Sequence, residues 1–132
     1  MKKDIQIQEV SNVYVAVVNE YNDIYKTHDW NAYIINVKDV DLEMVLIVTR
    51  GYNDTKVTST MRHKLEKLPA KSYAKIELMQ EEILALNNEF KVTFFEANKM
   101  FDKTYVFRKN TINKKAFQHI PLMEAKGILR GN

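Results

Sequence analysis

Cysteine is absent from this 132-residue chain, and glycine and proline are scarce, with three and two residues. Without cysteine the chain can form no disulfide, no thiolate metal site and no cysteine nucleophile. Its glycines, Gly51, Gly127 and Gly131, fit neither the phosphate-binding loop nor the dinucleotide fingerprint. Apart from the tyrosine-containing run at residues 13–18, the longest apolar run is residues 44–48, and both are far shorter than the roughly 20 residues of a membrane-spanning helix. These absences predict a protein without a membrane span and without the common nucleotide-binding motifs.

The N-terminus begins with Lys2 and Lys3, which could imitate the start of a secretory signal. Residues 4–9 then alternate between polar and apolar, and neither an apolar block of seven or more nor a small-residue cleavage site follows. Together with the lack of cysteine, this pattern predicts a cytoplasmic protein.

An alternation of period two dominates the chain, whose length suits one domain. Hydrophobic residues make up 45% and charged residues 28%, which is ordinary for a globular protein. The expected strands cover residues 13–18, 30–37, 42–49, 58–68, 73–78, 90–95 and 104–108. Seven short strands with turn signals between them are typical of a sandwich, and the scarcity of glycine argues against a closed barrel. The sequence therefore predicts an all-β, seven-stranded immunoglobulin-like β-sandwich.

Three details complete this prediction. Trp30 suits a large core anchor. The threonine-rich residues 58–60 predict the start of a partly exposed edge strand, and residues 80–86 predict one or two helical turns. From Asn110 the alternation stops, so we expect a sandwich domain over residues 1–109 and an irregular basic extension over residues 110–132. The extension belongs to the same domain or forms a flexible tail, docked on its own sheet or on a partner.

Part of this pattern resembles the bacterial immunoglobulin-like modules of the FxLYD type, over about a third of the chain. The matching elements are Ile35-Asn36, the turn at 39–41, the strand at 45–48, Gly51-Tyr52, the threonines at 58–60, Leu68-Pro69 and residues 72–76. The resemblance implies an immunoglobulin-like fold, but the chain departs from those modules in its basic tail and in lacking a secretion signal. The full length is also similar to a small uncharacterised protein family of Bacteroidetes, some of whose members carry a phenylalanyl-tRNA synthetase label. No glycine-rich or arginine-bearing motif for adenylate formation is present, so we expect no aminoacylation.

Candidate metal ligands lack the spacing that metals require. The three histidines, His28, His63 and His119, form no i, i+2 or i, i+4 pair. An acidic cluster at residues 39–43 lacks the glycine and the distal glutamate of a calcium loop, so it predicts a solvated turn. We therefore expect no metal and no cofactor.

Candidate nucleophiles lack a catalytic setting. Ser11, Ser59 and Ser72 have no glycine-flanked elbow and no recognisable neighbouring base. We therefore expect no enzymatic activity and no small-molecule substrate.

The basic tail is the feature with the strongest hint of a partner. Residues 108–132 contain six basic residues and one acidic residue, which gives +5 there and −2 over residues 1–107. The tail residues that could contact phosphates, with one aromatic to stack on a base, are Lys109, Lys114, Lys115, Phe117, Lys126 and Arg130.

Two functions follow from these patterns. The leading hypothesis is a non-catalytic binding or scaffold module that binds another protein or a second copy of itself, through its exposed sheet edge and tail. The alternative is nucleic-acid binding, to RNA, through the basic tail. A further expectation is an aromatic and basic surface formed by Tyr14, Tyr33, Phe95 and Lys91, which could equally belong to a core face or a dimer contact.

Overall fold

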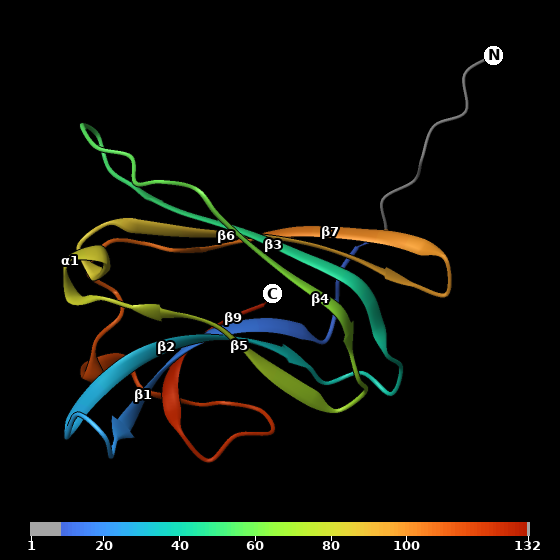
Figure 1. Cartoon of the computed structure of the whole chain (residues 1–132), viewed down its shortest axis with the longest axis horizontal. Coiled ribbons are helices and arrows are strands. Elements are labelled where there is room, and N and C mark those ends of the chain that lie inside the picture. Colours follow the sequence, from blue (N-terminus) through green and yellow to red (C-terminus); the bar gives the residue numbers. More distant parts are fainter. Residues whose placement is uncertain (1–8, 132) are drawn as a thin grey trace.

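Two antiparallel sheets pack face to face in the computed structural model, which describes residues 9–131 (Figure 1). The N-terminal stretch that lacks a signal-like block lies mostly outside the described residues. The five-stranded sheet has the order β5 (Ser72–Met79), β2 (Thr27–Asn36), β1 (Val13–Asn22), β9 (Lys126–Arg130), β8 (Gln118–His119). The four-stranded sheet has the order β4 (Met61–Leu68), β3 (Leu42–Tyr52), β6 (Asn87–Glu96), β7 (Lys99–Phe107). Within residues 9–131, no helix is long and apolar enough to cross a membrane.

The predicted all-β sandwich is confirmed, and the structure adds two strands to the seven expected. Both added strands, β8 and β9, come from the segment that the sequence predicts to be irregular. The expected helical turn forms as α1 (Glu81–Leu84), and a short 3-10 helix, η1, covers Lys114–Ala116. Residues 110–131 thus contribute regular structure as well as loops.

The expected edge strand exists as β4, but it begins at Met61 and leaves out residues 58–60. Thr58 is used to close the β3–β4 hairpin. Its backbone N–H donates to the carbonyl of Gly51 at 2.8 Å, and its hydroxyl accepts from the Gly51 N–H at 2.8 Å. Because these bonds hold the chain locally, the threonines do not extend the edge.

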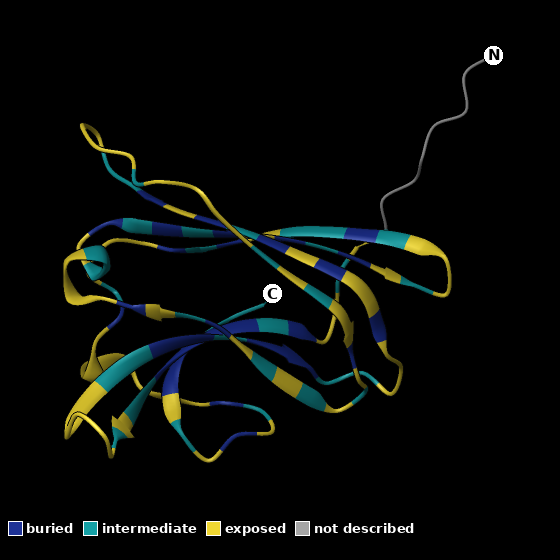
Figure 2. Cartoon of the chain, in the orientation of Figure 1, coloured by how far each residue is buried: buried dark blue, intermediate teal, exposed yellow. Residues whose placement is uncertain are grey.

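Aromatic rings fill the space between the sheets, where Figure 2 shows the buried residues. Three phenylalanines, Phe90, Phe94 and Phe107, are the largest fully buried side chains. Trp30, the expected anchor, is only partly buried at the rim of this core, where its ring lies 6.0 Å from that of Phe117. Trp30 therefore packs against the core as expected, but it is not one of the fully buried side chains at its centre.

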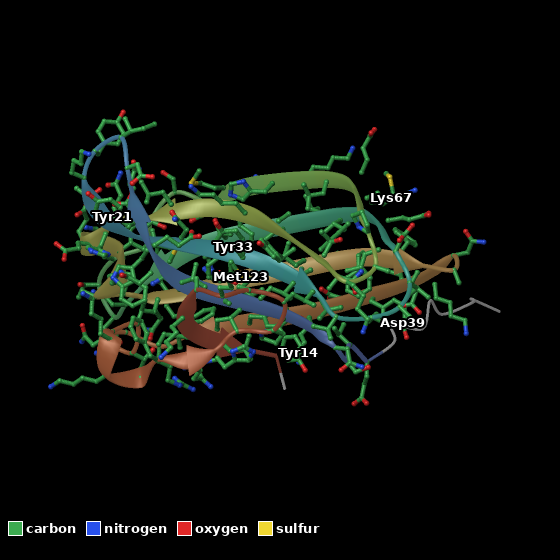
Figure 3. The ribbon with its side chains drawn as sticks, turned by 90° about the horizontal axis from the view of Figure 1, so that it is seen from below. Tyr14, Tyr21, Tyr33, Asp39, Lys67 and Met123 are labelled. Atoms are coloured by element: carbon green, nitrogen blue, oxygen red, sulfur yellow. The ribbon has the colours of Figure 1, made fainter. Side chains whose placement is uncertain are left out.

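Strand β1 is buried on both faces. Val13, Val15 and Val17 face the main core, whereas Ala16 and Val18 face outward. The outward pair contributes to a second apolar cluster, whose other buried members are Ile35, Ile120 and Met123. In Figure 3, which views this side, Met123 lies between Tyr14 and Tyr33. Part of the C-terminal segment therefore covers the outer face of the five-stranded sheet.

The β6–β7 hairpin turns through Ala97 and Asn98, with φ of 50° and 64°. Two positive φ angles in a two-residue loop are typical of a type I′ turn, which favours glycine. Replacing Ala97 by glycine is expected to stabilise the fold by about 0.5–1 kcal/mol, because it relieves the left-handed strain of the Cβ. Urea denaturation measures this gain. The matched variant Ala70→Gly, at a turn position without positive φ, should lose stability instead.

Candidate functional site

The six tail residues predicted to bind nucleic acid are distributed over several elements. Lys109 follows β7, and Lys114 and Lys115 lie in η1. Phe117 precedes β8, while Lys126 and Arg130 lie at the two ends of β9. The four lysines are exposed.

Phe117 and Arg130 are engaged in packing. The ring of Phe117 packs against Trp30 of β2. The guanidinium of Arg130 lies 5.2 Å from the ring centroid of Phe107 and donates to the carbonyl of Leu129 at 2.8 Å. Within the described residues, then, the aromatic and arginine side chains of the predicted site contact different strands.

The expected aromatic and basic surface does not form, because its members lie on opposite sides of the molecule. Tyr14 and Tyr33 belong to the outer cluster of the five-stranded sheet. Phe95 and Lys91 lie on the outer face of the four-stranded sheet, where register places Phe95 opposite Met100. The sandwich itself separates the two pairs.

Two phenols, the partly buried Tyr33 and the buried Tyr105, hold strands together. Burial raises the pKa of Tyr33 far above its usual value, and the Glu20 carboxylate, which accepts its hydrogen bond at 2.7 Å, raises that pKa further. Burial also raises the pKa of Tyr105, whose hydroxyl donates to the carbonyl of Val13 at 2.7 Å. Both hydroxyls therefore remain protonated donors at neutral pH, and neither is a nucleophile there.

The outer faces of the two sheets differ in what covers them. The C-terminal segment covers part of the outer face of the five-stranded sheet with Ile120 and Met123. No other described segment packs a hydrophobic cluster on the outer face of the four-stranded sheet. We call this second surface the open face, and it comprises the outward side chains of β4, β3, β6 and β7.

Apolar side chains are exposed on the open face, at its centre and towards one end. Leu46 of β3 is 38% exposed and Phe95 of β6 is 39% exposed. Antiparallel register places basic residues around Leu46 and its neighbour Val48, whereas Phe95 lies between Glu43 and Met100. Two neighbouring rows across β4, β3 and β6 read Arg62–Val48–Lys91 and Lys64–Leu46–Thr93.

The basic residues of these two rows are not paired with acidic side chains. No ion pair among residues 9–131 involves Arg62, Lys64 or Lys91. Side chains directly opposite on one face lie about 4.5–5.5 Å apart at Cβ, so these cations surround Val48 and Leu46 closely. The open face thus combines an exposed apolar centre with three basic side chains that form no ion pair, and the register also places the acidic Glu43 and Asp102 on this face.

A β-bulge presents part of this surface. Two residues of β3, Met44 and Val45, oppose a single residue of β6. Met44 has φ of 51° and is 53% exposed, whereas Val45 is fully buried. A left-handed conformation costs a residue with a Cβ about 1–2 kcal/mol, and strain of this kind is frequent at binding sites. The bulge leaves both Met44 and Leu46 exposed.

The described residues offer little to a metal ion. No group of three histidine, aspartate or glutamate side chains within residues 9–131 lies close enough to hold one. Small polar clusters do form: Glu77 contacts Thr49 and His63 at the β4–β5 edge, and Glu20 contacts Asn31 and Tyr33 on the five-stranded sheet.

No protein-family model matches the chain, and no curated protein matches it either. The functional conclusion therefore depends on the geometry of the described residues, and that geometry singles out the open face. The sequence contained one signal for it, the apolar Leu46 and Phe95 beside charged neighbours on adjacent strands. That signal was ambiguous, because the apolar run at 44–48 does not show which residues face outward.

Proposed function

We propose that this protein is a non-catalytic binding module that binds another protein through the open face. The observation that carries the proposal is the asymmetry between the two outer faces. The chain covers part of one with its own C-terminal segment and leaves Met44, Leu46 and Phe95 exposed on the other. Exposed apolar side chains rimmed by polar ones are typical of protein interaction surfaces.

The charge of the open face indicates the chemistry of the partner. Arg62, Lys64 and Lys91 surround the apolar centre, so a complementary surface carries acidic side chains around apolar ones. The aromatic rings of this face do not favour nucleic acid instead. Phe95 and Tyr52 lie at opposite ends of the face, and the guanidinium of Arg50 covers Tyr52 at 5.0 Å. Bases bind to platforms of successive aromatic side chains, which this arrangement does not provide.

We also propose that the sandwich belongs to the immunoglobulin-like class. The support is the order of pairing: β1 with β2, β2 with β5, β3 with β6, and β6 with β7. This order corresponds to the pairing of the first, second, third, fifth, sixth and seventh strands of that class. Strand β4 pairs with β3, and β8 and β9 extend the first sheet. A cytoplasmic setting, favoured by the lack of cysteine, is part of the proposal.

A photo-crosslinking amino acid at position 46 tests this function in cells. We expect a discrete crosslinked protein, and we expect the double variant Lys64→Glu/Lys91→Glu to reduce its yield about tenfold or more, because charge reversal repels an acidic partner. The matched probe at position 78 is on the exposed side of β5, in the other sheet. The matched charge control is Lys75→Glu on that same strand.

Equal crosslinking from positions 46 and 78, or a yield insensitive to Lys64→Glu/Lys91→Glu, would contradict the proposal. A product with twice the mass of the chain would identify the partner as a second copy of this protein. A crosslinked pair of copies and a crosslink to another protein differ in mass, so one experiment separates self-association from binding of another protein.

Nucleic-acid binding through the tail remains a second proposal. Its support is the exposure of Lys109, Lys114, Lys115 and Lys126. We rank it below protein binding because Phe117, the residue expected to stack on a base, packs against Trp30 instead.

A further inference from the structure

A cleft opens between β4 and β5, the two edge strands on one side of the sandwich. These strands leave a shared corner at residues 69–71 and diverge towards α1 (Figure 1). The cleft has a volume of about 280 Å³. Its lining includes Glu77 of β5, Met61 of β4, Ile83 of α1 and Phe90 of β6. It is therefore bounded by both sheets and by the helix.

Glu77 is the charged group that the sandwich turns inward at this cleft. Its partner in the β2–β5 register is Ala32, a residue of the main core, and its side chain is only 14% exposed. A β-bulge between the Ala32 and Tyr33 pairings shifts the register of β5 at this point. The hydroxyl of Thr49 donates to Glu77 Oε1 at 2.9 Å, and His63 Nε2 lies 2.7 Å from the same oxygen.

Both of these contacts end on Oε1, although a carboxylate offers about four acceptor positions on its two oxygens. Oε2 thus keeps its acceptor capacity in a partly desolvated place, and among the described residues His63 is the one basic side chain within ion-pair distance of this carboxylate.

The side-chain amide and the other charged side chains that line the cleft have partners within the chain. The side-chain amide of Asn88 donates to the carbonyls of Ile83 and Leu86. Arg50 pairs with Glu89 at 3.2 Å. Glu77 is therefore the charged acceptor with capacity for a ligand.

We propose that this cleft binds a primary ammonium group carried on an aliphatic stem. The ammonium donates to the carboxylate of Glu77, and the stem lies along Phe90, Ile83 and Met61. Hydrogen bonds between an ammonium and a carboxylate are about twice as strong as those between neutral groups. The volume is slightly below the roughly 300–1,000 Å³ of drug-sized ligand sites, so it fits a single side chain or a small amine. The ammonium belongs to a lysine of another protein or to a free alkylamine.

The titration of ¹⁵N-labelled protein with two amines tests the proposal. The probes are n-butylammonium chloride and Nα-acetyl-lysine N-methylamide, and 1-pentanol is the neutral control of similar length. We expect saturable amide shifts at Thr49, Ser59 and Phe90 with the amines and none with the alcohol. The variant Glu77→Gln should weaken binding at least tenfold, because it removes the charge and keeps an oxygen for Thr49 and His63. Glu66→Gln, on exposed β4, is the matched control and should leave binding unchanged.

A second variant protects the test against misfolding of Glu77→Gln. Met61 lines the cleft and is half exposed, and it makes no hydrogen bond to Glu77. Met61→Trp should therefore leave the protein folded while the larger side chain fills the cleft and blocks binding. Binding of both amines would indicate recognition of the alkylammonium itself, whereas binding of the lysine derivative alone would indicate a lysine side chain of a partner. Failure of the amines to shift the cleft residues, or binding that persists in Glu77→Gln and in Met61→Trp, would overturn the proposal. Neither Glu77→Gln nor Met61→Trp alters an outward side chain of the open face, so the result is independent of binding there.

Discussion

The substitution Ile120→Ala is expected to destabilise the protein by about 2–5 kcal/mol, the range for removing a large aliphatic side chain from a packed core. Ile120 lies in the C-terminal segment and is fully buried against the outer face of β1 and β2. The loss measures how strongly this segment is held on the sheet. Urea denaturation followed by far-ultraviolet circular dichroism gives the change in the free energy of unfolding.

Leu122 supplies the control for this prediction. It is an aliphatic residue two positions along the same segment, but it is 43% exposed. Leu122→Ala should therefore change stability by less than about 1 kcal/mol. If Ile120→Ala were as mild as Leu122→Ala, residues 110–131 would not be held on the sandwich as the structure has them, and the five-stranded sheet would lose its cover.

The substitution Asn36→Asp is expected to cost about 3–5 kcal/mol at neutral pH, because it places an uncompensated charge in a buried site. Asn36 is fully buried at the corner where the chain passes between the sheets. Its side-chain nitrogen donates to the carbonyls of Val40, Leu68 and Pro69 at 2.9, 3.3 and 3.0 Å. An aspartate would direct a negative oxygen towards these carbonyls while keeping nearly the same shape. Thermal and urea unfolding of the variant measure the loss.

Asn53→Asp is the matched control. The side-chain oxygen of Asn53 accepts from the backbone N–H groups of Thr55 and Lys56 at 2.9 and 2.8 Å in an exposed turn. A carboxylate accepts these bonds equally well, so stability should change by less than about 0.5 kcal/mol. Comparable losses in the two variants would mean that the donated bonds of Asn36 do not hold the corner together.

The strands could be predicted from the sequence because their alternation records which side chains face inward. The valines of β1 show both the success and the limit of this reading. Val13, Val15 and Val17 face the core as predicted, but nothing local shows what covers Ala16 and Val18. Ile120 and Met123, more than 100 positions away, cover them. These residues show no periodic pattern in the sequence, because they belong to a loop that crosses the strands. The sequence does not predict β9 either, because its five residues include Gly127 and show no clean alternation.

The candidate sites depend on distances that a linear pattern does not contain. Glu77 contacts residues 28 and 14 positions earlier, and the three meet only because β3, β4 and β5 converge at one edge. The open face likewise needs the register of β3 with β4 and β6 to bring Arg62 and Lys91 to the two sides of Val48. The tail residues showed the opposite case. Their charge was plain in the sequence, yet packing directed Phe117 and Arg130 to separate strands.

The sequence by itself determined that this protein is built of strands, most of them with one apolar face, because alternating side chains can be buried only by a second layer. It also determined the positions of most turns, since residues such as Asn98 tolerate conformations that others resist. Only the tertiary structure decided which outer face is covered and which strand edges diverge. Both features depend on contacts between segments that are distant in the sequence. The free energy of these contacts is spread over many side chains, so no single position in the sequence reveals it.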